Sequence, residues 1–96
     1  MPEVGAMIYE TEEFEVSDVD GFVRAFEGFR SSFEGAGATD HRVFRHTREP
    51  NRVLATIQWP DLESCHAFAR EHEAEFQSTF GPVIVSASPS EQWEAL

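Results

Sequence analysis

The sequence predicts one α+β domain in which an antiparallel four-stranded sheet carries two helices on one face. Residues 52–59 alternate polar and apolar side chains as a strand does, and a helical spacing that starts after Pro60 continues to Phe80. Five apolar residues between positions 19 and 33 recur every three or four residues, which is typical of one face of a helix. With 96 residues, of which 41% are hydrophobic, the chain is long enough for one core, and no change in composition marks a second domain.

The first part of the chain predicts a strand and then a helix. Residues 4–16 form the strand, because their side chains alternate loosely between two faces. These faces are Val4, Ala6 and Ile8 on one side, and Met7 and Tyr9 on the other. Asp18 is placed to cap the helix, since its carboxylate can accept N–H groups of the first turn. The apolar side of this helix consists of Val19, Phe22, Phe26, Phe29 and Phe33. Gly35 and Gly37 can adopt the positive φ that ends it.

The second part predicts a hairpin, a helix and a last strand. Strand two covers residues 38–48, and Glu49, Pro50 and Asn51 have the chemistry of a tight connection to strand three, residues 52–59. Asp61 is placed to cap the second helix. One face of that helix comprises Leu62, Cys65, Ala69, His72 and Phe76, with Phe68 at its edge. Residues 82–88 form strand four, and residues 89–96 are a short acidic tail that Trp93 holds loosely.

This order of elements is the split β-α-β arrangement of ferredoxin-like domains. Right-handed crossovers put both helices on the same face of the sheet. The other face then carries Met7, Tyr9, Phe44 and Leu54. An apolar surface of this kind tends to associate in water. A second copy of the sheet is its simplest cover, so we expect a homodimer packed sheet to sheet.

Charge and cysteine content limit the classes of partner. Eighteen acidic residues stand against seven arginines with no lysine, which gives a formal charge of -11 and a field that repels phosphate backbones and anionic lipids. We therefore expect no nucleic-acid and no membrane partner. Cys65 is the only cysteine, so an internal disulfide is impossible and a reducing, cytoplasmic location is expected. The absence of lysine fits either a salt-adapted host or a host whose codon usage favours arginine.

The stretch HRVFRHTREPNRVLATIQWPDLESCHAF, followed by a helix that ends in Phe80-Gly81 and a short apolar strand, resembles the dimeric α/β-barrel superfamily. The resemblance is to its antibiotic-biosynthesis-monooxygenase-like members and its small cyclase-like members. It implies a pocket between helices and sheet, and a cofactor-independent oxygenation of an aromatic or polyketide-like molecule. Haem-degrading members carry a Trp and a His on the second helix, where this chain has Phe68 and Ser78 or Thr79. We expect no cofactor.

His72 is the candidate catalytic residue. Its place on the apolar face of the second helix directs an ionisable ring toward the implied pocket, where it could relay a proton. The alternative is a histidine at the edge of the core, bonded to a backbone carbonyl. The candidate substrate-binding residues are Tyr9, Trp59, Phe68 and His66. No metal site is predicted, because His66 and His72 are six residues apart and lie on different sides of the helix.

Positive charge is concentrated in the hairpin, at His41, Arg42, Arg45, His46, Arg48 and Arg52. These residues could bind a small anion, but pairing with acidic residues of a neighbouring strand or of a partner subunit is the simpler explanation. Three functions remain open on the sequence: an oxygenase, a dimer that binds or senses a small hydrophobic or aromatic ligand without reaction, and a structural dimer with a filled interior.

Overall fold

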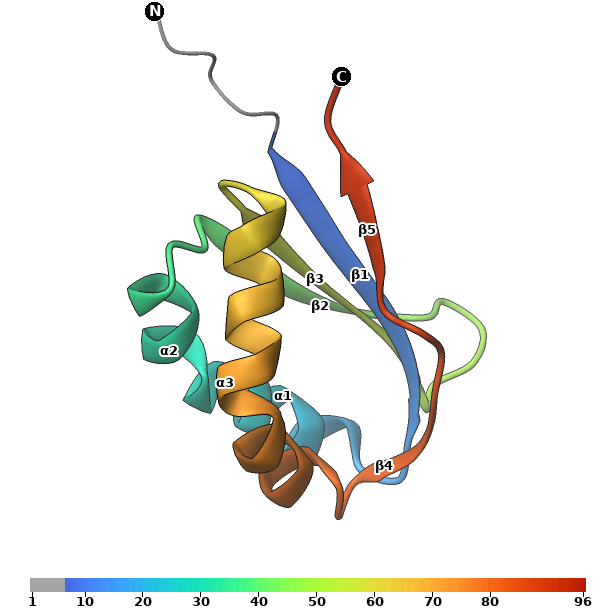
Figure 1. Ribbon diagram of the computed structural model, residues 1–96. Coiled ribbons are helices and arrows are strands. Elements are labelled where there is room, and N and C mark those ends of the chain that lie inside the picture. Colours follow the sequence, from blue (N-terminus) through green and yellow to red (C-terminus); the bar gives the residue numbers. More distant parts are fainter. Residues whose placement is uncertain (1–6) are drawn as a thin grey trace, which may run out of the picture.

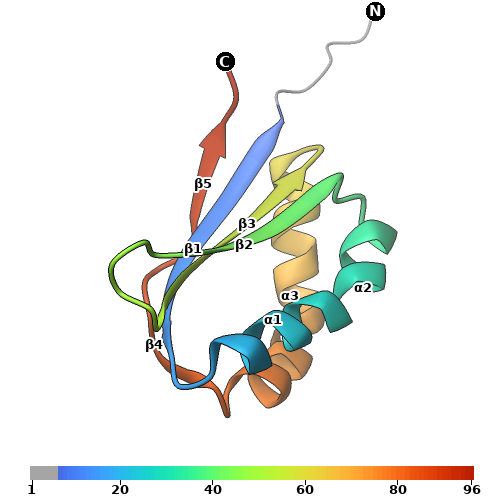
Figure 2. The ribbon, with the colours of Figure 1, turned by 180° about the vertical axis from the view of Figure 1, so that it is seen from behind.

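The computed structural model describes residues 7–96, which form one layer of antiparallel strands and one layer of helices (Figure 1). The elements are β1 (Ile8–Val16), α1 (Val19–Gly28), α2 (Arg30–Gly35), β2 (Asp40–Arg45), β3 (Arg52–Trp59), α3 (Leu62–Phe80), β4 (Ile84–Ala87) and β5 (Glu91–Glu94). The strand order is β2-β3-β1-β4, and β5 pairs with the first half of β1, whereas β4 pairs with its second half. All helices lie on one side of the sheet, and no helix within residues 7–96 covers the other side (Figure 2).

This arrangement confirms the predicted ferredoxin-like order of elements and the single helical layer. β3 and α3 have the predicted bounds. β2 and β3 pair antiparallel as the predicted hairpin, and β1 pairs antiparallel with β3 from Ile8 opposite Trp59 to Glu15 opposite Arg52. None of the helices in residues 7–96 is both long enough and apolar enough to span a bilayer.

The first predicted helix is divided in two. α1 ends at Gly28, and α2 begins after Phe29, whose φ of -89° and ψ of -1° interrupt the regular helix. Glycine has a low helix propensity, so the chain redirects at this point at little cost. The predicted cap is present, since the Gly21 N–H donates to Asp18 Oδ1 at 3.0 Å. The phenylalanines of the apolar face remain buried on both sides of the break: Phe22, Phe26, Phe29 and Phe33.

Strands β2 and β4 are shorter than predicted. Of the first predicted strand, residues 4–6 lie outside the described residues, and β1 begins at Ile8. β2 stops at Arg45, because His46 Nδ1 accepts the N–H groups of Arg48 and Glu49 and so holds the chain in a turn. β4 has four residues, whereas seven are predicted.

The predicted acidic tail contains a fifth strand. β5 pairs antiparallel with β1, with Ile8 opposite Glu94 and Thr11 opposite Glu91. Trp93 anchors it as expected, since Trp93 Nε1 donates to Thr11 Oγ1 at 3.0 Å. The sheet thus has five strands within residues 7–96, rather than four. The segment EQWE has no apolar alternation from which this strand could be predicted. In the structure all four of its residues are exposed.

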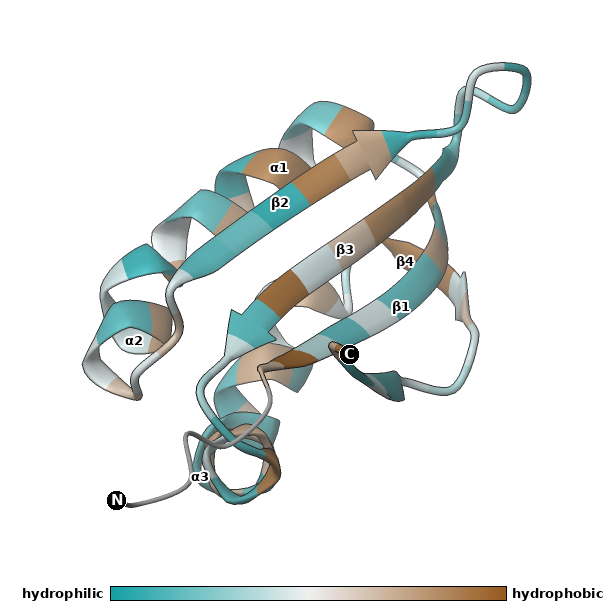
Figure 3. Cartoon of the chain, turned by 90° about the horizontal axis from the view of Figure 1, so that it is seen from above, coloured by the Kyte–Doolittle hydropathy of each residue, from teal (hydrophilic) through white to brown (hydrophobic). Residues whose placement is uncertain are grey.

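The core lies between the sheet and the helices. β1 and β3 present alternate side chains to it, as the apolar bands along β3 indicate (Figure 3). Trp59, Phe22 and Phe80 are fully buried, and the rings of Phe22 and Phe80 lie 5.1 Å apart. On the opposite face, Tyr9 and Phe44 stay 41% and 46% exposed. The sheet therefore has one packed face and one open face with aromatic side chains.

Candidate active site

A cavity of about 450 Å³ lies between the sheet and the helices. Its apolar wall is made mainly of aromatic rings: Phe14, Phe22, Phe26, Phe33, Phe68 and Phe76, with Ala55, Ile57 and Ala69. A volume of this size accommodates a small organic molecule. The predicted pocket is therefore present, and the interior of the subunit is not filled by the phenylalanines.

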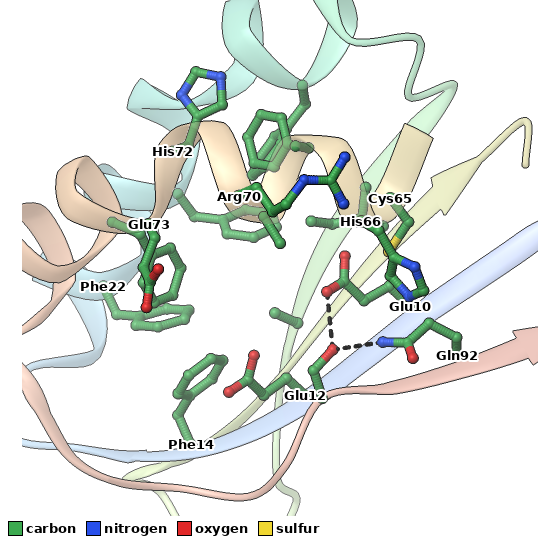
Figure 4. A pocket seen from close by; sticks show the side chains of 18 residues that line it. Glu10, Glu12, Phe14, Phe22, Cys65, His66, Arg70, His72, Glu73 and Gln92 are labelled. Carbon is green, nitrogen blue, oxygen red and sulfur yellow. Dashed lines mark hydrogen bonds between the residues drawn. The ribbon is translucent and has the colours of Figure 1, made fainter. Parts of the chain in front are cut away.

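Two carboxylates of β1 enter this cavity, Glu10 and Glu12 (Figure 4). Side chains two residues apart in a strand share a face, so both lie on the same side as the buried Phe14. Glu10 is held in place by two donors, since Trp59 Nε1 lies 3.0 Å from its Oε1 and Ser90 Oγ lies 2.9 Å from its Oε2. Gln92 Nε2 in turn donates to Ser90 Oγ at 2.9 Å, so β5 completes this polar wall.

Glu12 is the carboxyl group of the cavity whose pKa is clearly shifted. Burial raises the pKa of its carboxyl from the ordinary 4.5 to about 7, and the charge of Glu10 acts in the same direction. Its side chain points into the cavity beside the phenyl wall (Figure 4). A carboxyl group with a pKa near 7 exchanges a proton readily at neutral pH, which suits it to act as an acid or a base.

Helix α3 forms the opposite wall. Its start is fixed by Asp61, whose Oδ1 accepts the Ser64 N–H at 2.7 Å. The polar residues of α3 that line the cavity are His66, Arg70, His72 and Glu73. His72 stacks on Phe68 with ring centroids 4.3 Å apart, and its Nδ1 lies 3.0 Å from Glu75 Oε1. Its ring is turned away from Glu10 and Glu12 (Figure 4).

The structure brings together only some of the predicted site residues. His66, Phe68 and His72 line the cavity. Trp59 does not line it, but it is fully buried behind the wall and orients Glu10. Tyr9 lies on the open face of the sheet, outside this cavity, because neighbouring residues of a strand point to opposite faces.

Glu10 and Glu12 are site residues that the sequence did not single out. Their signal was their even spacing from Ile8, Phe14 and Val16, which places all five side chains on one face of β1. Acidic residues in a strand usually indicate a solvated face, so this spacing gave no reason to assign them to a pocket.

The basic hairpin pairs mainly with acidic neighbours in sequence and across the sheet. Arg52 lies 3.0 Å from both Glu13 and Glu49, and Arg42 lies 2.9 Å from Asp40. Glu13 is on the open face of β1, so the Arg52–Glu13 pair is the cross-strand pairing that the sequence favoured over anion binding.

Cys65 is a buried thiol of the cavity wall. It is 2% exposed, and burial raises the pKa of its thiol to about 12. The thiolate is therefore not formed at neutral pH, and Cys65 contributes packing to the cavity wall.

No family model matches the sequence, and no curated protein is significantly similar to it. Similarity appears among solved structures. A candidate antibiotic biosynthesis monooxygenase from Bordetella bronchiseptica superposes with a TM-score of 0.81 at 17% identity, covering 95% of this chain and 98% of that chain. SnoaB, a cofactor-independent oxygenase from Streptomyces nogalater, has a TM-score of 0.79 at 14% identity, covering 95% of this chain and 94% of that chain. The protein shares their fold.

A dimeric ferredoxin-like protein from an uncultured marine organism is a further structural neighbour. Its TM-score is 0.69 at 9% identity, with 95% of this chain and 89% of that chain covered. These similarities confirm the fold that the resemblance implied. At such low identity they carry no activity over to this chain.

Proposed function

We propose that the protein is a cofactor-independent monooxygenase-like enzyme that oxygenates an aromatic or polyketide-like small molecule. The observation that carries this proposal is the ionisable Glu12, with a pKa of about 7, against an otherwise phenyl-lined cavity. The structural similarity to SnoaB, a cofactor-independent oxygenase, supports it.

The residues of the cavity suit a reaction that begins with loss of a proton. Glu12 accepts a proton from an activated ring carbon, and the resulting carbanion forms a bond to molecular oxygen, which is the oxidant. Glu12 then returns the proton to the peroxide. The O–O bond breaks, water leaves, and the ring carbon, having lost two hydrogens, becomes a carbonyl. The phenyl wall holds the ring of the substrate, and the hydrogen bonds of Glu10 keep that second carboxylate in place.

His72 as proton relay stays a prediction, as does substrate contact by His66 and Phe68. Their positions on the cavity wall support these roles. His72→Ala should abolish turnover without unfolding the protein if His72 relays a proton. Unchanged activity in this variant assigns His72 to packing against Phe68 and to its bond with Glu75.

We also propose that the protein is a cytoplasmic homodimer, in which a second copy covers the open face of the sheet. Tyr9, Phe44 and Trp93, between 41% and 55% exposed, are exposed aromatic side chains on this face. Sedimentation of the purified protein at micromolar concentration should give a dimer. Phe44→Glu should give a monomer, because it puts a charge into the contact; a monomer already in the wild type rejects this assembly.

Oxygen uptake with anthrone-type or quinol substrates tests the enzymatic function. Glu12→Gln should reduce the rate by about 100-fold or more, since general acid–base catalysis is typically worth that much. Glu15→Gln is the matched control, because it makes the same change on the same strand at an exposed position. Binding without oxygen uptake for any such substrate would instead identify a non-catalytic ligand-binding dimer.

A further inference from the structure

The charges around the cavity are unequal. Three carboxylates line it, those of Glu10, Glu12 and Glu73, against one guanidinium, that of Arg70. The two histidines of α3 that line it, His66 and His72, are the remaining titratable groups of opposite sign. α1, α2 and β3 contribute only apolar side chains, and β5 contributes Ser90 and Gln92. Within residues 7–96, the groups facing Glu12 therefore leave an excess of negative charge.

None of the arginines of the sheet, Arg42, Arg45 and Arg52, lines the cavity. Arg52, which bridges to β1, does so through Glu13 on the open face. Arg42 is bound to Asp40 on β2. An anionic ligand that reached Glu12 would thus place a carboxylate beside two others in a partly desolvated site, where like charges repel more strongly than in water.

The carboxylates of Glu10 and Glu12 differ in the hydrogen bonds that they accept. Trp59 and Ser90 already occupy the carboxylate of Glu10, whereas no side chain within the described residues donates to the carboxylate of Glu12 (Figure 4). A ligand hydroxyl group can donate to Glu12 without introducing charge, while its ring lies on the phenyl wall.

We propose that the cavity selects aromatic ligands whose polar groups are neutral hydrogen-bond donors, such as phenolic hydroxyls, and excludes aromatic ligands that carry a carboxylate. This inference rests on the proposed function, because it concerns the ligand of the same cavity.

Calorimetric binding of 2-naphthol and of 2-naphthoate, at pH 8 and without oxygen, tests the selection. The two probes share a ring system, and at this pH the first is neutral and the second anionic. 2-Naphthol should bind at least about tenfold more tightly, the ratio that corresponds to 1.4 kcal/mol. Equal affinities of the two probes for the wild-type protein overturn the inference, and this comparison needs no variant.

Binding of the same two probes to the Glu12→Gln variant tests whether Glu12 is the source of the selection. This variant should narrow the preference several-fold by strengthening 2-naphthoate binding, whereas Glu15→Gln should keep the wild-type preference. A preference that is the same in both variants excludes Glu12 as its source and overturns the inference. Lowering the pH from 8 to 6 should strengthen 2-naphthoate binding in the wild type, because Glu12 takes up a proton in this range. The part of this effect that Glu12→Gln abolishes belongs to Glu12.

The binding and turnover results are separable. The expected preference without any oxygen uptake leaves the inference intact and rejects the oxygenase function. Oxygen uptake together with equal binding of both probes rejects the inference and leaves the oxygenase function intact.

Discussion

Glu12→Gln should stabilise the folded protein, and more so at alkaline than at acid pH. The carboxyl of Glu12 has a pKa of about 7 in the folded chain against an ordinary 4.5. Below pH 4.5 it is protonated in both the folded and the unfolded states and contributes nothing. Between pH 4.5 and 7 the unfolded chain ionises first, so stability falls as the pH rises, and above pH 7 the full penalty of the buried charge is present.

The size of the effect follows from the same pKa. A rise from 4.5 to about 7 corresponds to roughly 3 kcal/mol at full burial. Glu12 is only half-buried, and water at the open side of the cavity screens its charge, so we expect about 1–2 kcal/mol. For a domain of this size that is an increase in Tm of about 5–10 °C at pH 8.5.

Urea unfolding of the wild type, Glu12→Gln and Glu15→Gln at pH 5 and pH 8.5 measures this effect. At pH 8.5 both variants remove one negative charge from β1, so both relieve the general repulsion of the acidic surface equally. At pH 5 Glu12 is already protonated in the folded chain, so only Glu15→Gln removes a charge there. Only Glu12→Gln should gain extra stability, and this gain should be larger at pH 8.5. Equal changes in the free energy of unfolding for the two variants at both pH values would refute the assignment of a buried, destabilised carboxyl to Glu12.

Four further results are expected. Phe80→Ala should lower the free energy of unfolding by about 3–5 kcal/mol in urea titrations, because the fully buried ring leaves a cavity. Trp59→Phe should lower it by about 1–3 kcal/mol, since Glu10 loses a donor at a partly buried site; an unchanged midpoint contradicts this. Cys65 should react with a thiol reagent at pH 8 no faster than the chain unfolds. Raising the salt concentration should increase Tm by screening the net charge of -11, and a decrease counts against surface self-repulsion.

Much of the fold could be predicted because local signals agree along the chain. Pro60 and Asp61 mark the junction of β3 and α3, and the structure keeps the predicted bounds of both elements. The break at Phe29 was less predictable, since the phenylalanine spacing continues across it at nearly helical steps. β5 was not predictable at all, because its pairing with β1 relies on backbone hydrogen bonds and on Trp93 rather than on an apolar pattern.

The residues of the candidate site could also be predicted only in part. The spacing along α3 was enough to bring Phe68 and His72 to one wall, because neighbours on a helix are set by its period. His66 also lines this cavity, although the spacing had placed it on a different side of the helix from His72. Glu10 and Glu12 are site residues only because α3 and β5 cover their face of β1 in the folded protein. Strand periodicity says which side chains share a face, but the desolvation that raises the pKa of Glu12 depends on elements brought there from more than fifty residues away in the chain.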